Sequence, residues 1–226
     1  MQQLDSYVNE IKRTLEAKAN FDISIQQKRY MRNKFEFFGI KANSRRKATG
    51  KFMKKAERPE YYNLSYVVKK LWVLPEREFQ YFGLDLVERY IDDFDRGIME
   101  LLEYMIINKS WWDTVDMVAK KFVGQYFIKF PNKKKYYLSK WIDSDSIWLQ
   151  RTAILFQLGY KEDTDIELLF KIIHQLKDID EFFIQKAIGW SLRQYSRVDG
   201  SVIVKFVENN ELSSLAEREA LKTVNS

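Results

Sequence analysis

The sequence predicts an all-α fold, and three features point to it. Glycine and proline, the residues that most often interrupt helices, account for only 8 and 3 of the 226 residues, about 5% against an average near 12%. Apolar residues recur at the three- to four-residue spacing of one helix face along most of the chain. Similar segments also return at intervals of 32 to 37 residues. No segment has the alternating pattern and tight turn of a β-hairpin.

The first helices follow from this spacing. Residues at i, i+4, i+7 and i+11 are apolar near the N-terminus, which predicts one amphipathic helix through Leu4, Val8, Ile11 and Leu15. Apolar residues continue from Tyr30 to Phe38 and predict a second helix that stops at Gly39, because glycine commonly ends a helix.

The remaining helices are predicted from their starts. Pro75 suits a first-turn position, with acidic residues after it. Serine, asparagine and aspartate side chains can cap a helix N-terminus, and they precede the other segments at Asn43 or Ser44, Ser110, Asp143 or Ser144, and Asp178 or Asp180. We therefore expect about a dozen helices of 10 to 18 residues.

Four of the segments share a pattern in which a basic residue precedes a small or apolar run. The segments are PEREFQYFGLDLV, IWLQRTAILFQL, FFIQKAIGWSL and LAEREALKTV, and the basic residues are Arg77, Arg151, Lys186 and Arg218. Their separations are 74, 35 and 32 residues, and the midpoint of the longest falls at Thr114, within WWDTVD. This period predicts a HEAT-like solenoid of about six two-helix units. Residues 1–226 would then form a single repeat domain with a concave binding face. The repeated cations either form a ladder along that face or pair with neighbouring acids.

Composition excludes several kinds of chemistry. The chain has no cysteine and one histidine, His174, which excludes disulfides, thiolate metal sites, a cysteine nucleophile and sites that need two imidazoles. We expect no metal and no cofactor. An enzyme of this composition would depend on carboxylates and aromatic side chains.

The net charge of +6 is unevenly distributed along the chain. Residues 28–58 contain 12 Lys and Arg but only Glu36 and Glu57, and residues 117–142 contain seven Lys and no acid, so the rest of the chain sums to −11. Concentrated basic stretches favour a polyanionic partner, with nucleic acid ahead of anionic membrane; a solvated charged surface is the alternative.

No run of 18 apolar residues and no apolar leader is present. We therefore expect a cytoplasmic protein that does not bind membranes.

Two clusters combine aromatic and charged residues. In SWWDTVD, Trp112 and Asp116 are four residues apart and would share a helix face. In AIGWSLR, Trp190 and Arg193 are three apart and would do the same. The alternative for each tryptophan is packing in the core.

These strings carry a family resemblance. NKSWWDTVD, SDSIWLQRTAILFQL, EFFIQKAIGWSLRQYSR and NNELSSLAEREALK, together with LWVLPEREFQYFGLDL and RYMRNKFEFFGI, resemble the DNA alkylation repair enzyme family, the AlkD-like alkylpurine DNA glycosylases. The resemblance runs in order from about Gln26 to Lys222. It implies a HEAT-like solenoid that acts on double-stranded DNA as a monomer, in base excision repair, and hydrolyses the glycosidic bond of cationic N3- or N7-alkylated purines.

The resemblance also implies roles for individual residues. Asp116 matches the catalytic aspartate, and Trp112 and Trp190 match the tryptophans that contact the cationic nucleotide. Tyr30, Arg151 and Arg193 match family positions in the DNA-binding cleft. We add Arg46 and Arg197 to the expected DNA-binding residues. A HEAT-repeat protein that binds DNA without catalysis, and a solenoid scaffold that binds proteins, remain the alternatives.

Overall fold

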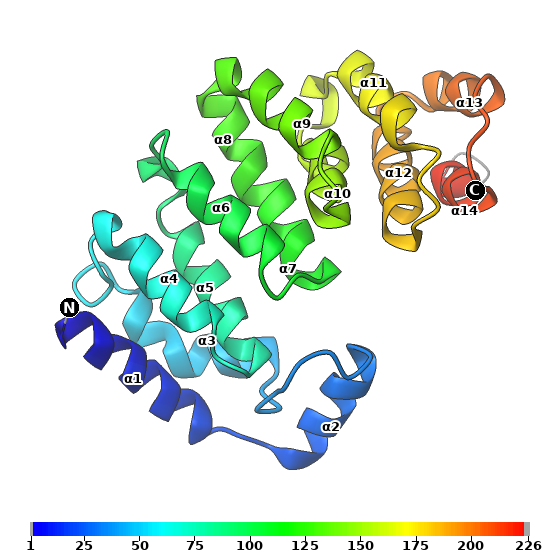
Figure 1. Cartoon of the computed structure of the whole chain (residues 1–226). Helices are drawn as coiled ribbons and strands as arrows, with labels where there is room; N and C mark the ends of the chain where they lie inside the picture. Colours follow the sequence, from blue (N-terminus) through cyan, green and yellow to red (C-terminus); the bar gives the residue numbers. More distant parts are fainter. Residues whose placement is uncertain (1, 224–226) are drawn as a thin grey trace. The chain divides into compact units, whose positions relative to one another are not determined.

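The computed structural model describes residues 2–223, and it confirms the all-α prediction (Figure 1). Within those residues the only β-type pairing is an isolated bridge between Glu36 and Glu76. The chain divides into two compact units, Met1–Leu101 and Leu102–Ser226. The single repeat domain therefore stays a prediction. No helix in the described part of the chain is long and apolar enough to cross a membrane.

The first unit begins with a helix whose apolar face packs into the core, as predicted. The helices of this unit are α1 (Gln2–Glu16), α2 (Phe21–Tyr30), α3 (Ala42–Thr49), α4 (Leu64–Trp72) and α5 (Arg77–Glu88), while α6 (Ile98–Ile107) crosses the boundary between the units. Val8, Ile11 and Leu15 of α1 are buried.

The helix predicted from Tyr30 to Phe38 is wrong. Helix α2 ends at Tyr30, because Arg32 and Asn33 take the left-handed backbone conformation with φ of 54° and 56°. Gly39 also has a positive φ, 86°, and a Cβ there would lie 2.0 Å from the carbonyl oxygen of Asn20. The apolar residues of this segment therefore pack from a loop.

A buried carboxylate holds this loop in place. Glu78 of α5 is fully buried and accepts hydrogen bonds from the backbone N–H groups of Phe38, Gly39 and Ile40 at 3.0–3.1 Å. The carboxylate thereby satisfies backbone N–H groups that have no partner in a helix. The loop that follows α2 is thus attached to α5 through one side chain.

Most helices of the second unit are shorter than the sequence predicted. The helices of this unit are α7 (Trp112–Met117), α8 (Gly124–Lys129), α9 (Lys134–Ile142), α10 (Ile147–Leu155), α11 (Ile166–Leu176), α12 (Phe182–Tyr195), α13 (Gly200–Glu208) and α14 (Ser214–Ala220). Only α11 and α12, with 11 and 14 residues, reach the expected length. A π-helical turn, Val118–Val123, joins α7 to α8. Helix α10 packs against α7, α9, α11 and α12, and α12 packs most extensively against α14.

Several predicted helix starts are displaced. Helix α3 begins after Lys41 and α7 after Trp111, and α10 is capped by Ser146, whose hydroxyl accepts a hydrogen bond from the Leu149 N–H. The Ser110 hydroxyl donates to the Ile106 carbonyl instead, at the end of α6. The remaining starts are also offset: Pro75 precedes the α5 cap, Glu76, and Glu181 is the cap residue before α12.

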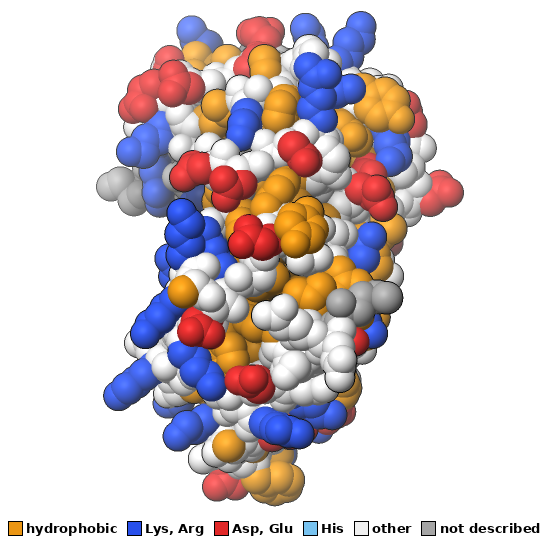
Figure 2. Space-filling model, turned by 90° about the vertical axis from the view of Figure 1, so that its left-hand side faces the viewer, with side chains coloured by type: hydrophobic (Ala, Val, Ile, Leu, Met, Phe, Trp, Pro, Cys, Tyr) orange, Lys and Arg blue, Asp and Glu red, His pale blue; other side chains and the backbone are white. Residues whose placement is uncertain are grey.

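The basic stretches are partly neutralised within each unit. Arg45 is buried and bonds Asp85 at 2.7 Å, and Lys28 pairs with Glu36. In the second unit Lys140 bonds Glu103 at 2.7 Å. On the face drawn in Figure 2, acidic side chains lie among the basic ones. Net charge along the sequence therefore overstates the free positive surface.

Candidate active site

The site predicted around Asp116 lies in the second unit, on α7. Trp112 opens this helix, and Asp116 follows four residues later, one turn along the same face. Both side chains are partly exposed. The π-helical turn begins two residues after Asp116, and such turns are frequent at functional sites.

Arg151 of α10 holds the Asp116 carboxylate with two parallel hydrogen bonds. Arg151 Nε lies 2.7 Å from Asp116 Oδ1, and Nη2 lies 2.9 Å from Oδ2. The remaining terminal nitrogen, Nη1, donates to the backbone carbonyl of Phe183 on α12. One guanidinium therefore joins three helices, α7, α10 and α12.

Burial differs between the two partners and determines what each can contact. The Arg151 side chain is 4% exposed, whereas the Asp116 side chain is 15% exposed. The family resemblance implies a DNA-binding role for Arg151, and the structure places its guanidinium inside, on Asp116. Asp116 keeps an accessible edge. Each carboxylate oxygen can accept two hydrogen bonds, and Arg151 occupies one on each.

The surroundings shift the pKa of Asp116 upward. Burial raises this pKa because it removes water from the charged form, and the Asp113 carboxylate raises it further. The hydrogen bonds and positive charge of Arg151 act in the opposite direction. Asp116 is thus a carboxylate whose ionisation depends on its arginine partner.

Three aromatic rings pack beside this pair. The ring of Phe183 lies 4.9 Å from those of Trp111 and Trp148, centroid to centroid, and the two tryptophans are 5.8 Å apart. The Arg151 guanidinium lies 5.9 Å from the Phe183 ring. Trp111 is buried among these rings, while Trp112 stays partly exposed.

The pairing of Asp116 with Arg151 follows from the repeat. Helices α5, α7, α10, α12 and α14 begin after Glu76, Trp111, Ser146, Glu181 and Ser213. The fifth residue after each of these caps is Tyr81, Asp116, Arg151, Lys186 and Arg218. Arg77, one residue after its cap, is therefore not the counterpart of Arg151. Asp116 and Arg151 therefore occupy the same position in successive helical repeats.

The second predicted cluster lies on α12. Trp190 is partly exposed, and Arg193 bonds the buried Glu219 carboxylate of α14 at 2.9 Å. Lys186 and Lys222 contact the same carboxylate. Burial raises the pKa of Glu219, but hydrogen bonds from Lys186 and Lys222 outweigh it and bring the pKa to about 2. In this structure Arg193 attaches α14 to α12.

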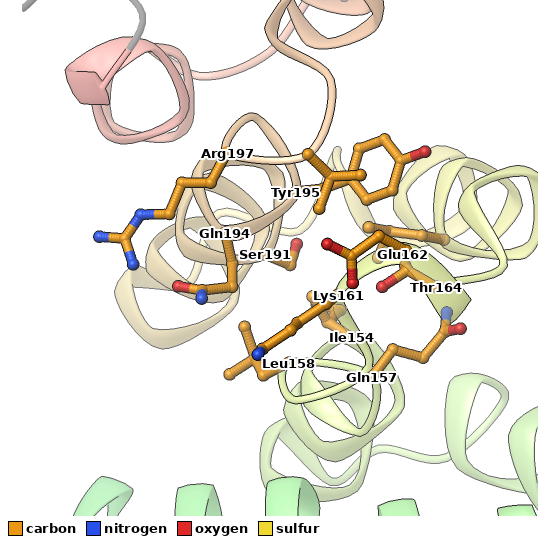
Figure 3. Close-up of a pocket in the computed structure, with 12 residues that line it drawn as sticks. Ile154, Gln157, Leu158, Lys161, Glu162, Thr164, Ser191, Gln194, Tyr195 and Arg197 are labelled. Carbon is orange, nitrogen blue, oxygen red and sulfur yellow. The ribbon is translucent and has the colours of Figure 1, made fainter.

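Arg197 lies elsewhere on this unit. It lines a cavity of about 260 Å³ near the C-terminal ends of α10 and α12, together with Lys161, Gln194 and Tyr195. Its guanidinium points away from the other lining side chains (Figure 3). The Arg197 side chain is exposed.

Tyr30 and Arg46 belong to the first unit. Tyr30 is 70% exposed at the end of α2, and Arg46 on α3 is exposed and lies 3.5 Å from Asp85. The structure therefore joins Asp116, Trp112 and Arg151 in one local arrangement. Sequence reasoning missed the Phe183 carbonyl and the ring of Trp148. The 35-residue spacing from Asp116 to Arg151 was the signal that could have identified their contact.

Comparisons with known proteins bear on the fold and the family of this chain. The family model described as DNA alkylation repair enzyme matches residues 11–224. A solved structure titled "Predicted DNA alkylation repair enzyme from Enterococcus faecalis" superposes with a TM-score of 0.84 and 31% sequence identity. The match covers 90% of this chain and 95% of that one, and is consistent with a helical-repeat solenoid. No curated protein matches the chain significantly.

Proposed function

Since the chain belongs to the DNA alkylation repair enzyme family, we propose that it is a monofunctional DNA glycosylase. Its substrate is double-stranded DNA that contains cationic N3- or N7-alkylated purines. It hydrolyses the N-glycosidic bond and acts as a monomer. Its place of action is the bacterial cytoplasm, where the cellular DNA lies. The observation that carries the proposal is the partly exposed Asp116 carboxylate, bonded by Arg151 and one turn from Trp112.

The substrate explains how such a site can work. An alkylated purine carries a positive charge, so the bond from C1′ to the base nitrogen can break with both electrons moving to the purine. The base leaves neutral, and no general acid is needed to protonate it. What remains is positive charge on the sugar ring. A fixed negative charge next to C1′ is therefore the main catalytic requirement.

Asp116 meets this requirement. Its ionised carboxylate stabilises the oxocarbenium-like sugar, as carboxylates do in glycoside hydrolysis. An oxygen lone pair not occupied by Arg151 can orient the attacking water. The water oxygen bonds to C1′, and its proton passes to Asp116 and then to solvent.

Arg151 and the tryptophans support the same step. Arg151 opposes the rise in the Asp116 pKa and fixes both carboxylate oxygens. Trp112 and Trp190 provide aromatic faces for the cationic nucleotide, each contributing about 0.5–2 kcal/mol. Tyr30, Arg46, Arg193 and Arg197 are the remaining residues proposed to bind DNA.

Release of 7-methylguanine and 3-methyladenine from methylated duplex DNA tests the proposal directly. We expect the wild-type protein to release these bases, and Asp116→Asn to lower the single-turnover rate about a hundredfold or more. Binding of the same duplex should survive, because the amide retains the size of the carboxylate. Chromatography of the released bases and anisotropy titration of labelled duplex measure the two effects.

The matched control is Asp145→Asn. Asp145 is exposed in the turn before α10, and its amide variant should release bases at the wild-type rate. DNA binding without any base release by the wild-type protein would indicate a non-catalytic DNA-binding function. Neither binding nor release, even at low salt, would favour a protein-binding scaffold.

A further inference from the structure

A second surface lies between the helices α9 and α11. The two helices pack on each other and border a groove of about 770 Å³. None of Asp116, Arg151, Trp112 or Trp190 lines it. The groove is thus separate from the candidate active site, within the same unit.

The floor of the groove is apolar. Leu138 and Ile172 form its buried part, with 4% and 1% exposure, and Ile142 and Leu168 are partly exposed beside them. A recessed apolar strip of this kind is stabilised when apolar side chains cover it.

The rim of the groove is positively charged. Lys134, Lys135 and Lys171 line it, and within residues 2–223 none of the three forms an ion pair. Asp143 is the single acidic side chain among the lining residues that the structure describes. Two of these lysines come from the acid-free stretch of residues 117–142, so this part of the basic charge borders the groove.

We infer that this groove binds a short amphipathic helix of an acidic partner protein. Helices α9 and α11 have 9 and 11 residues, so the groove is about 14–17 Å long, which corresponds to about three helical turns. Apolar residues at i, i+4 and i+7 of the partner would cover the floor. Acidic residues on both sides of that stripe would meet Lys135 and Lys171.

The apolar floor decides among possible occupants. A DNA backbone would neutralise the lysines but leave Leu138 and Ile142 uncovered by apolar groups. An anionic membrane requires apolar side chains that project outward, whereas Leu138 and Ile172 are recessed. A helix with an apolar stripe between acidic flanks would cover the apolar floor and pair with the lysines of the rim.

A designed peptide tests the inference on the full-length protein. The probe is a fluorescein-labelled peptide of about 14 residues, about four helical turns, made of Ala, Glu and three Leu, with the leucines at i, i+4 and i+7. Its control has the same composition with the leucines dispersed around the helix. By fluorescence anisotropy we expect the patterned peptide to bind at least about tenfold more tightly than its control.

Charge reversal locates the binding. Lys135→Glu combined with Lys171→Glu should weaken patterned-peptide binding about tenfold or more, and Lys205→Glu on α13, an exposed lysine outside the groove, should not. Equal binding of the two peptides would overturn the inference. A second result would also overturn it. In that result, short duplex DNA or phosphatidylglycerol vesicles compete with the peptide on the wild-type protein, and the double variant abolishes this competition but still binds the peptide. Base release by the double variant reports separately on the proposed function.

Discussion

At the residue scale, the proposed chemistry depends on one ion pair between successive repeats, Asp116 with Arg151. Burial raises the pKa of Asp116, because desolvation favours the neutral carboxyl. Arg151 reverses part of that effect and also fixes the orientation of both oxygens. The proposed reaction needs no second carboxylate, provided that Asp116 remains ionised.

Replacement of Arg151 should change the pH profile of base release. Without the guanidinium, burial raises the pKa of Asp116 further, so protonation of Asp116 begins at higher pH. The acid limb of the single-turnover rate should therefore move to higher pH in Arg151→Gln, and less far in Arg151→Lys, which keeps one charge. Rates measured from about pH 4 to 8 on DNA with 7-methylguanine check this expectation. An unchanged profile with a uniformly lower rate would mean that Arg151 does not control the ionisation of Asp116.

At the element scale, the contact between α12 and α14 depends on a glycine. A Cβ on Gly189 would lie 2.5 Å from the Glu219 Cβ and 2.6 Å from the Ala216 carbonyl oxygen. The close approach brings the Glu219 carboxylate to Lys186 and Arg193 on α12. Gly189 therefore has a packing reason to occupy the middle of a helix, where glycine is otherwise unfavourable.

Gly189→Ala should destabilise the protein by about 1–3 kcal/mol, because the new methyl group overlaps backbone atoms of α14. Gly50→Ala is the matched control. Gly50 has φ of −58°, and a methyl group added there would meet nothing within 4 Å, so alanine should be neutral or stabilising by about 0.5–1 kcal/mol. Thermal unfolding followed by circular dichroism measures both changes. Equal midpoints for the two variants would rule out the close helix contact.

At the scale of the whole molecule, the two basic stretches have different surroundings. The stretch of residues 28–58 carries Arg46 and Lys47, both exposed on α3. The stretch of residues 117–142 supplies Lys134 and Lys135 to the groove between α9 and α11. Their contributions to DNA binding should therefore differ, although the sequence presents them as similar.

The salt dependence of DNA binding separates the two stretches. Arg46→Gln with Lys47→Gln should weaken binding of alkylated and undamaged duplex alike. It should also reduce the slope of log K against log salt by about 0.9 for each phosphate that the variant no longer binds. Lys134→Gln with Lys135→Gln should leave the slope unchanged. An equal reduction of the slope in both variants would assign the second stretch to DNA as well.

Much of the secondary structure could be predicted from periodicity, and the errors have identifiable causes. The apolar spacing of α1 was sufficient, because every residue of that face is in a regular helix. The segment after Tyr30 has similar apolar content but packs from a loop, since two consecutive left-handed residues and the buried Glu78 determine its path. Helix starts were displaced where the capping side chain bonded elsewhere, as Ser110 does.

The sequence by itself determined the helical class and the repeat near 35 residues, and its lack of cysteine and single histidine predicted a carboxylate as the catalytic group. Each of these depends on residue type and spacing, which a single chain records. Tertiary structure alone decided which charged side chains pair with one another inside the protein. Arg151 meets Asp116 and Arg193 meets Glu219 because packed helices bring them within hydrogen-bonding distance. Burial then makes such pairs obligatory, since an unpaired charge away from water is costly.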